Sequence, residues 1–358
     1  ADGAGLDASD RDGAAEGPAI NIDTYPGLNG MYMPDAIDSY VAGGQTYLVT
    51  ANEGDVREWG EYIDEARVEN LEEDGYGPVC ADSPLASLTG AADLGRLAVS
   101  REDGFNADEG CYEELYSYGA RSFSIWSTSG ELVWDSGDAF EQLTADLLPA
   151  NFNSDHGASE FDTRSDAKGP EPEAVTVGEI DGVPYAFVGL ERVGGIMVFD
   201  LSSPTDASFV TYLNNRDFSV SGEDATDAAG LAAAGDLGPE GIAFIAAEDS
   251  PTGAPILAVG NEVSGTTTVY AVDSTLDTTT DVQVLTINDF HGRIEPNFGS
   301  GEAGAAVIAG AVSQFESENP NTLFVSSGDM IGASTFTSFI QQDNPTIDAL
   351  VEAGLDLG

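Results

Sequence analysis

A unit that occurs three times along the chain limits its fold more than any other sequence feature. Each copy begins with proline, an acidic residue, a small residue and a β-branched residue, then passes through a turn into an apolar segment that ends in glutamate. The leading acid and the closing glutamate are 18, 18 and 22 residues apart, which indicates repeated copies of one small β unit. The leading acids are Asp35, Glu173 and Glu240, and the closing glutamates are Glu53, Glu191 and Glu262.

Short strands with glycine-rich turns, repeated about every 68 residues, are typical of β-propeller blades. The leading acids are 138 and 67 residues apart, and 138 is close to two periods. A further strand pair is expected inside the longer interval, at residues 121–126 and 131–134, and outer strands at 195–200 and 267–272. We therefore expect a mainly β fold with a partial β-propeller of about four blades before residue 275, whose earlier blades are missing. An irregular array of β-sandwiches is the alternative.

The repeated acids and several other acidic groups are candidates for ion binding. Equivalent positions of successive blades converge near the axis of a propeller, so the six repeated acids could line an ion site or hydrogen-bond backbone amides between blades. We favour the structural role. Three further groups offer the hard oxygen ligands that calcium prefers, but with 64 acidic residues such groups also arise from composition, so solvated loops are the favoured interpretation. These groups are Asp7, Asp10 and Asp12; Asn52, Glu53 and Asp55; and Asp155, His156, Glu160, Asp162 and Asp166.

The chain is strongly acidic, with 64 Asp and Glu against 11 Lys and Arg and a formal net charge of −53. Such a surface disfavours nucleic-acid polymers, whose phosphates need basic contacts, and it disfavours anionic membranes. Its self-repulsion is screened within about 3 Å at 1 M salt. We therefore expect a secreted or cell-surface protein from a saline environment. An acidic secreted protein without salt adaptation is the alternative.

The two cysteines, Cys80 and Cys111, lie in a stretch rich in glycine and aspartate. In an extracellular protein, a disulfide between them would close a loop and contribute about 3–4 kcal/mol. Two buried thiols are the alternative. No segment is apolar for long enough to span a membrane, and the first residues have no signal-peptide character. Anchoring at a cell surface would therefore depend on regions outside this chain.

The sequence pattern changes after a short polar linker at residues 276–281. A buried-type strand at 282–288, a helix at 303–318 and a second strand at 321–326 predict a β-α-β unit, and another helix is expected at 346–353. The two strands of such a unit are parallel, so side chains that follow them meet at one edge of the sheet. This is the edge where α/β folds place their sites.

Metal-ligating side chains follow both of these strands. Asp289 and His291 come after the first strand, and Asp329 comes after the second. Hydrolysis of phosphoesters by two metal ions needs a bridging carboxylate and further oxygen and nitrogen ligands. Asp289 and His291 point the same way from an extended segment and could bind one ion, while Asp329 could bridge. Asn288 and Arg293 are candidates for a supporting role, and the alternative is that Asp289 and His291 merely cap a turn.

The segments that carry these ligands, TINDFHGR (286–293) and SGDMIG (327–332), resemble the first two blocks of the 5′-nucleotidase branch of calcineurin-like metallophosphoesterases. The resemblance covers residues 281–358 and assigns the same three ligands to metal binding. It implies a secreted hydrolase that cleaves small phosphate esters or nucleotides with two divalent ions, Zn, Mn, Mg or Ca. The family's next block, Gly-Asn-His-Glu/Asp, would come just after Gly358. We therefore expect a C-terminally truncated domain that has no activity by itself.

Residues 1–275 resemble a second family, the choice-of-anchor I propeller-like domain of secreted bacterial and archaeal proteins. That family is commonly attached to surface anchors or to phosphoesterase domains, and its biochemical role is poorly defined. Its N-terminal blades have no counterpart in this chain. The matching segments are LDASDRDG (6–13), TANEGD (50–55), YGARSFS (118–124), GPEPE (169–173) and GLER (189–192).

Two functions from different classes follow. The main interpretation is a fragment of a secreted, metal-dependent phosphoesterase, with a propeller-like domain at 1–275, the linker, and the start of the catalytic domain at 282–358. The alternative is a non-catalytic extracellular propeller that binds surface polymers or calcium. A weaker third hypothesis has the propeller hydrolyse phosphate esters through calcium at its axis. A Ser/His/Asp hydrolase finds no support, because His156 lies in a loop and no Gly-x-Ser-x-Gly turn is present.

Overall fold

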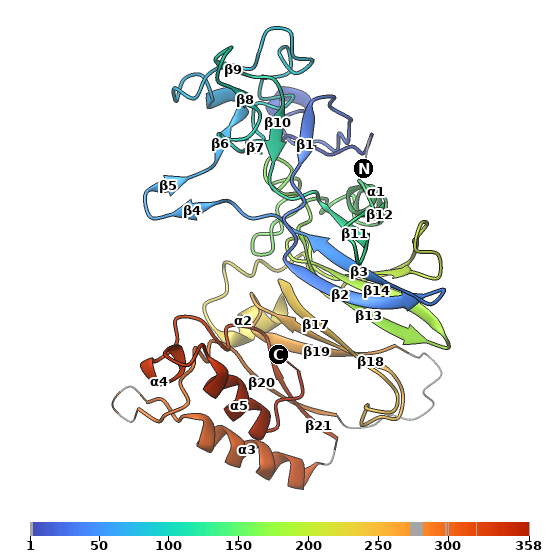
Figure 1. The fold of residues 1–358 in the computed structure, drawn as a ribbon, viewed down its shortest axis with the longest axis vertical. Coiled ribbons are helices and arrows are strands. Elements are labelled where there is room, and N and C mark those ends of the chain that lie inside the picture. The colour runs from blue at the N-terminus through green and yellow to red at the C-terminus, as the bar shows by residue number, and fades with distance from the viewer. Residues whose placement is uncertain (1–2, 273–281, 298, 300, 320, 358) are drawn as a thin grey trace. The chain divides into compact units, whose positions relative to one another are not determined.

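The computed structural model describes residues 3–272, 282–297, 299, 301–319 and 321–357, which are mainly β (Figure 1). Contacts along the chain divide it into two compact units, Ala1–Pro239 and Glu240–Gly358. Among the residues that the structure describes, no helix is both apolar and long enough to cross a membrane. The linker predicted at residues 276–281 lies outside the described residues.

Two four-stranded antiparallel sheets in the first unit each follow the chain as a meander. The first two strands of each sheet are joined by Gly43-Gly44, with φ of 59° and 80°, and by Asp181-Gly182, with φ of 53° and 82°. Positive φ at both positions is the geometry that a tight two-residue hairpin needs. One sheet contains β2 (Ala36–Ala42), β3 (Gln45–Asn52), β11 (Ser122–Ser127) and β12 (Leu132–Asp135), and the other contains β13 (Pro172–Ile180), β14 (Val183–Leu190), β15 (Ile196–Asp200) and β16 (Ser208–Leu213).

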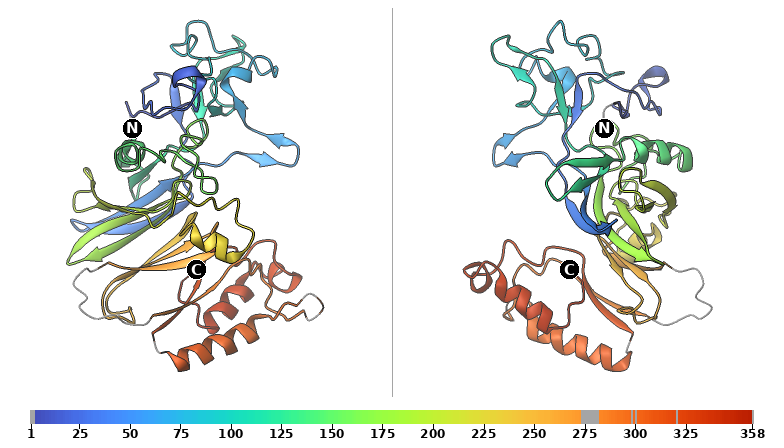
Figure 2. Two further views of the ribbon diagram at one scale, coloured as in Figure 1. Left: turned by 180° about the vertical axis from the view of Figure 1, so that it is seen from behind. Right: turned by 45° about the vertical axis from the view of Figure 1, so that its right-hand side comes forward.

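The two sheets share one hydrophobic core. β13 contacts β2 and β3, and Figure 2 shows the blue strand β2 beside the green strand β13. Phe123 of β11 and Phe199 of β15 have ring centroids 4.8 Å apart, so the third strands of the two sheets also meet. Phe140 of helix α1 (Ala139–Leu147) packs on the same two rings. Adjacent four-stranded meanders agree with the repeat, and closure into a propeller stays a prediction.

The strand pair predicted at residues 121–126 and 131–134 is present, but it completes the first sheet instead of forming a separate one. β11 pairs with β3 in an antiparallel register that begins at Asn52 and Ser122. Residues 53–121 are therefore an insertion between the second and third strands of a single sheet. Local periodicity could not show this, because the paired segments are 70 residues apart.

The insertion packs around a second hydrophobic core, in which Leu71, Leu97 and Tyr112 are buried together with Ala8 of the N-terminal segment. A disulfide joins Cys80 to Cys111 within it, and the described residues contain no free cysteine. The short elements around this core are β4 (Glu58–Trp59), β5 (Tyr62–Ile63), β6 (Ala66–Arg67), η2 (Val68–Asn70), β7 (Ala98–Val99), β8 (Phe105–Asn106), β9 (Cys111–Tyr112) and β10 (Leu115–Ser117), and β10 pairs with β1 (Leu28–Gly30), which follows η1 (Ala14–Glu16).

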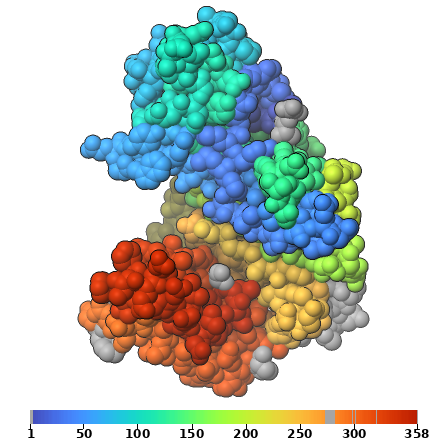
Figure 3. Space-filling model, in the orientation of Figure 1, coloured from blue at the N-terminus to red at the C-terminus, as the bar shows by residue number. Residues whose placement is uncertain are grey.

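The hairpin β4–β5 of the insertion exposes aromatic side chains. Trp59 is 69% exposed and stacks on Tyr62 with ring centroids 5.9 Å apart. In the space-filling view this light-blue hairpin projects into solvent (Figure 3). Its two strands pair with each other and with no other described strand, so the hairpin is held by few contacts.

The second unit combines a third repeated sheet, of three strands, with the predicted β-α-β unit. The parallel strands pair from Gln283–Thr322 to Ile287–Ser326. Leu323 and Val325 share one core with Ile256 of the three-stranded sheet, within the compact unit that begins at residue 240. The remaining elements are α2 (Ala228–Ala233), β17 (Pro239–Ile245), β18 (Ile256–Asn261), β19 (Thr266–Ala271), β20 (Gln283–Ile287), α3 (Ala305–Glu318), β21 (Thr322–Ser326), α4 (Phe336–Phe339) and α5 (Asn344–Glu352).

Candidate functional site

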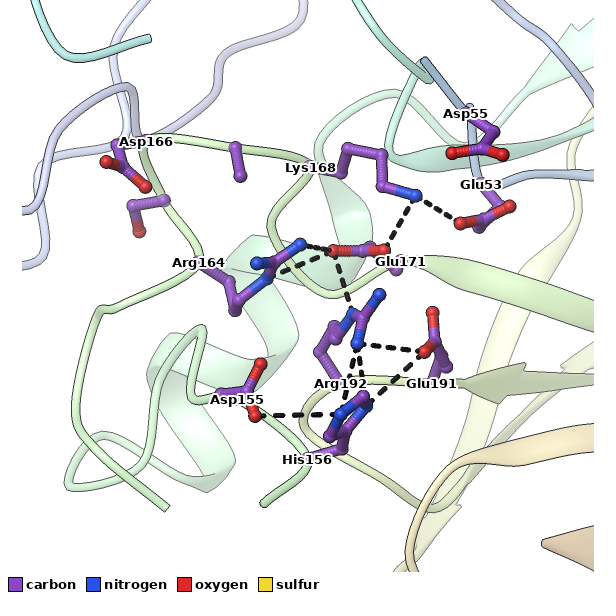
Figure 4. Close-up of polar contacts among 12 residues, drawn as sticks. Glu53, Asp55, Asp155, His156, Arg164, Asp166, Lys168, Glu171, Glu191 and Arg192 are labelled. Atoms are coloured by element: carbon purple, nitrogen blue, oxygen red, sulfur yellow. Dashed lines mark hydrogen bonds and ion pairs between the residues drawn. The ribbon is translucent and has the colours of Figure 1, made fainter. Parts of the chain in front are cut away.

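A network of charged side chains lies where the second strands of the two meander sheets end (Figure 4). Glu53 directly follows β3, and Glu191 directly follows β14. The loop before β13 adds Arg164, Lys168 and Glu171. The carboxylates of Glu53, Glu171 and Glu191 offer oxygen atoms that all lie within 4.8 Å of one another. Two of the repeated glutamates therefore converge, as expected of equivalent positions in neighbouring sheets.

Glu171 is the centre of this network. Its side chain is fully buried, and Lys168 Nζ lies 2.9 Å from its Oε2. Arg192 Nε and Arg164 Nε each lie 3.1 Å from Oε1. Burial by itself would raise the pKa of Glu171, but the charges of Arg164, Lys168 and Arg192 outweigh it and lower the pKa. Glu171 is therefore ionised at neutral pH and fixes three cations in place.

Glu53 has the opposite electrostatic character. It forms an ion pair with Lys168, the only lysine of the chain. Burial nevertheless raises the pKa of Glu53 to about 7, and the charge of Lys168 offsets this only in part. Glu171 and Glu53 are thus neighbouring carboxyl groups, one with a lowered pKa and one with a raised pKa. Such a pair is suited to proton transfer, or to binding a group that carries both a positive and a negative charge.

Arg192 extends the network to His156. Arg192 Nε pairs with Glu171, and its Nη1 lies 3.0 Å from Glu191 Oε1. His156 Nδ1 lies 2.7 Å from Arg192 Nη1 and 3.3 Å from Glu191 Oε1, and Asp155 lies 3.8 Å from the other ring nitrogen. Because three cations already neutralise the three glutamates, the donor set does not fit a divalent metal well.

Sequence reasoning found only part of this network. It singled out Glu53 and Glu191 but chose Glu173 over Glu171 as the leading acid of the second unit, although Glu171 precedes the same proline. Glu173 is buried within β13, and Asp35 lies near enough to Lys168 for their charges to interact. The signal that could have found the network is the solitary lysine beside GPEPE. The other two repeated acids, Glu240 and Glu262, lie in the second unit.

The structure regroups the acids that were considered for calcium. Asp10 and Asp166 share the guanidinium of Arg96, at 3.0 and 2.7 Å. Asn52 donates hydrogen bonds to Ser122 and Ser124 of the neighbouring strand. Asp55 accepts from the next backbone N–H, and the backbone carbonyl of Glu160 accepts from Thr163. These residues therefore form ion pairs and hydrogen bonds with nearby segments, and calcium binding by them stays a prediction.

The second candidate site is the group Asp289, His291 and Asp329 in the second unit. Its ligand atoms lie within 4.8 Å of one another, at the ends of the parallel strands β20 and β21. His291 N–H donates to the backbone carbonyl of Asp329 at 2.9 Å, and His291 Nδ1 lies 2.9 Å from the Gly332 carbonyl. His291 Nε2 faces Asp289 Oδ1 at 3.5 Å.

All three residues have a left-handed backbone conformation, as do twelve other described residues that are not glycine. Asp289, His291 and Asp329 have φ of 51°, 45° and 53°, a region that residues other than glycine seldom adopt. Such strain gathers at sites where side chains must be aimed. Of the two supporting candidates, Asn288 is exposed beside Asp289, while Arg293 pairs with Glu302 at 3.0 Å and is directed toward that residue.

Comparison with known proteins supports one of the resemblances. The family model for the choice-of-anchor I domain matches residues 2–204. A mesenchyme-specific cell surface glycoprotein of Strongylocentrotus purpuratus is 31% identical over 227 residues, which are 55% of this chain and 28% of that protein. Gigasin-3a of Magallana gigas is 33% identical over 196 residues, 52% of this chain and 68% of the relative. Endonuclease YhcR of Bacillus subtilis is 30% identical over 87 residues, 22% of this chain and 7% of the enzyme.

Proposed function

This chain belongs to the choice-of-anchor I domain family, and we propose that it is an extracellular module that functions at a cell surface. The observation that carries this proposal is the disulfide between Cys80 and Cys111, with no free cysteine among the described residues. Disulfides persist in oxidising compartments and are rare in the cytosol. A relative whose name places it at the cell surface points the same way. The chain covers less than a third of that relative, so its attachment is also part of the proposal.

The charge of the chain limits the chemical classes of partner that such a module can bind. A net charge of −53 repels polyanions, including nucleic acids and anionic membranes. Cations, cationic groups and neutral surface polymers remain as partners. The same charge favours a saline setting, where self-repulsion is screened. For the charged network around Glu171, a group that carries both an ammonium and a carboxylate has the matching chemistry.

Thiol labelling tests the extracellular assignment. Protein taken directly from the producing cells is denatured and treated with a maleimide-coupled polymer before and after reduction. We expect no gel shift before reduction and two added polymers afterwards, and we expect protease added to intact cells to remove the protein. Two thiols that react without reduction, together with protease resistance, would contradict the proposal.

We also propose a second function, in which the group Asp289, His291 and Asp329 supplies part of a metal site for the hydrolysis of small phosphate esters or nucleotides. Its support is the convergence of two carboxylates and one imidazole at the C-terminal edge of a parallel strand pair, the edge where α/β folds place their sites. Mixed oxygen and nitrogen ligands suit Zn²⁺ or Mn²⁺. When bound, such ions would supply an activated water molecule.

Calorimetric titration with Mn²⁺ tests this second function. Asp289→Asn removes one ligand, and Asp348→Asn is a matched control because Asp348 is an exposed aspartate of α5 in the same unit. We expect the affinity of the chain for Mn²⁺ to fall at least tenfold in the first variant and to stay unchanged in the second. Equal affinities in the wild type and in Asp289→Asn would overturn the assignment.

A further inference from the structure

We propose that the side chains of Lys168 and Glu53 join through an amide bond, with Glu171 as the residue that carries the proton between the reacting atoms. The bond links Lys168 Nζ to the carboxyl carbon Cδ of Glu53 and releases one water molecule. It ties the residue after β3 to the loop before β13, two positions that are 115 residues apart. This is a covalent modification of the chain, independent of the disulfide and of both functions proposed above.

The identity of the cation beside Glu53 is the first observation. The chain has 11 Lys and Arg residues, and Lys168 is the only lysine among them. The same network otherwise uses arginines, since Arg164 and Arg192 both contact Glu171. An arginine in place of the lysine could pair with carboxylates through its planar fork, but it could not lose its proton. A lysine amine that loses its proton is a nucleophile, so the one lysine of the chain stands where an amine can react.

Hydrogen bonds hold the reacting groups in contact (Figure 4). Lys168 Nζ donates to Glu53 Oε1 and lies 2.9 Å from Glu171 Oε2. Because Nζ bonds to a carboxyl oxygen of Glu53, it lies within reach of the carboxyl carbon, as reactants must before a bond can form. The side chains of Lys168, Glu53 and Glu171 are 12%, 13% and 0% exposed, so little solvent water competes for the acyl group.

The proton on the lysine has an acceptor in Glu53. Burial lowers the pKa of Lys168, but the charges of Glu171 and Glu53 outweigh it and raise the pKa, so the amine becomes free only by giving its proton to a neighbour. Burial raises the pKa of Glu53 to about 7, which makes this carboxylate the one that accepts the proton. The transfer removes two charges from a buried place. It also converts Glu53 into a carboxylic acid, which an amine attacks more readily than a carboxylate.

The neighbouring carboxylates differ from Glu53 in their charge state and their partners. The three cations around Glu171 outweigh its burial and lower its pKa, so it stays ionised. An ionised carboxylate is a poor acyl group, but it can accept a proton from a more acidic intermediate. Glu191 is paired with Arg192 Nη1 at 3.0 Å. Glu53 is therefore the acyl group, and Glu171 is the proton carrier.

The reaction balances without a further reactant. The proton moves from Lys168 Nζ to Glu53 Oε1, and the free amine attacks Cδ to form the N–C bond. The nitrogen of the tetrahedral intermediate gives a proton to Glu171 Oε2, which passes it to the hydroxyl group that leaves as the C–O bond breaks. One ammonium and one carboxylate thus become one amide and one water molecule. Glu171 ends ionised, as it began, and stays paired with Arg164 and Arg192.

The intact mass of the purified chain tests the bond. After reduction and denaturation, which break the disulfide and the ion pairs, we expect the wild type to be lighter than its sequence mass by one water molecule. Trypsin should fail to cut after Lys168 and should release residues 12–57 joined to residues 165–192, with fragmentation placing the link between Lys168 and Glu53. A wild type with its full sequence mass and a normal cut after Lys168 would overturn the proposal, and so would a link at another residue.

Variants of the two linked residues identify the reacting atoms. Lys168→Arg keeps the positive charge without the amine, and Glu53→Ala removes the acyl carbon, so both variants should have their full sequence masses. Glu53→Gln keeps that carbon and should give the same linked product as the wild type, with ammonium released in place of water. A mass deficit of one water molecule in Lys168→Arg would show that the loss arises elsewhere and would contradict the proposal.

Glu171→Gln keeps both reacting groups and removes the proton carrier. We expect its linked fraction to be at least about tenfold lower than that of the wild type purified at the same time after expression. Asp64→Asn is the matched control, because Asp64 is equally buried in the first unit but pairs with Arg57 at 2.5 Å, and it should link as the wild type does. Circular dichroism checks that each variant is folded, and if Glu171→Gln is not, the wild-type mass still decides whether the bond forms. A folded Glu171→Gln with the linked fraction of the wild type would refute the role of Glu171.

Discussion

Replacing Glu171 by glutamine gives the sharpest test of the charged network in the first unit. The change keeps the size of the side chain but removes the charge that faces Arg164, Lys168 and Arg192. The side chains of these three partners are 24%, 12% and 19% exposed, so water cannot readily replace the lost carboxylate. Breaking a buried ion pair by removing one partner costs about 3–5 kcal/mol, and three cations depend on this single carboxylate. We expect a loss of that size in the free energy of unfolding.

The assay is urea unfolding at constant ionic strength and neutral pH, which gives the midpoint and the m value. Because the pKa of Glu171 is lowered, its contribution is fully present above the pKa of an unfolded glutamate and is lost as the pH falls through the lower folded value. The difference between wild type and variant should therefore shrink in acid. Glu53→Gln is the matched control: burial raises the pKa of Glu53 to about 7, so its carboxyl group is already partly neutral and the cost should stay below about 1 kcal/mol. Similar small losses for both variants would refute the central role of Glu171.

Three further predictions concern stability. Replacing Cys80 and Cys111 by serine should cost about 3–4 kcal/mol in urea unfolding, because the disulfide closes a loop between positions 31 residues apart; a loss that reducing agent does not reproduce in the wild type would contradict this. Phe123→Ala should cost about 3–5 kcal/mol in the same assay, since its ring is fully buried between the two sheets, and an effect below 1 kcal/mol would mean that the sheets do not pack there. Burial raises the pKa of Asp7 to about 7 and that of Asp162 to about 8, so these two groups stabilise the folded state fully below about pH 4 and this contribution is lost as the pH rises through about 7 and 8. Tm should therefore fall between about pH 5 and 9, and a Tm that rises over this range would contradict the linkage.

The sequence predicted those parts of the fold that depend on local pattern. The repeated unit predicted the first two strands of each sheet, because a tight turn between two apolar segments depends only on residues that are neighbours in the sequence. The β-α-β unit was equally visible from periodicity. The pairing of β3 with β11 was not, because nothing near Asn52 indicates that its partner is Ser122.

The candidate sites also divide into those that the sequence could predict and those that it could not. Asp289 and His291 could be grouped with Asp329 because parallel strands bring their ends together. Glu53 and Glu191 could be grouped because they hold equivalent places in a repeat. No such rule could group Asp7 with Asp162, which accept hydrogen bonds from the backbone N–H groups of Asn21 and Ala19, because two irregular segments far apart in sequence bring them there.

The insertion within the first sheet has a consequence for the order of folding. The second sheet is built from the continuous stretch 172–213 and can form by successive hairpins. The first sheet must bring together strands whose facing residues, Asn52 and Ser122, are 70 positions apart, and the entropy of closing so long a loop slows pairing. An insertion that folds first, with its disulfide already formed, would hold both ends of that loop close together. We therefore expect oxidation of the two cysteines to determine when the first sheet can be completed. Under reducing conditions the second sheet should refold at its normal rate, while pairing of β3 with β11 in the first sheet should be delayed.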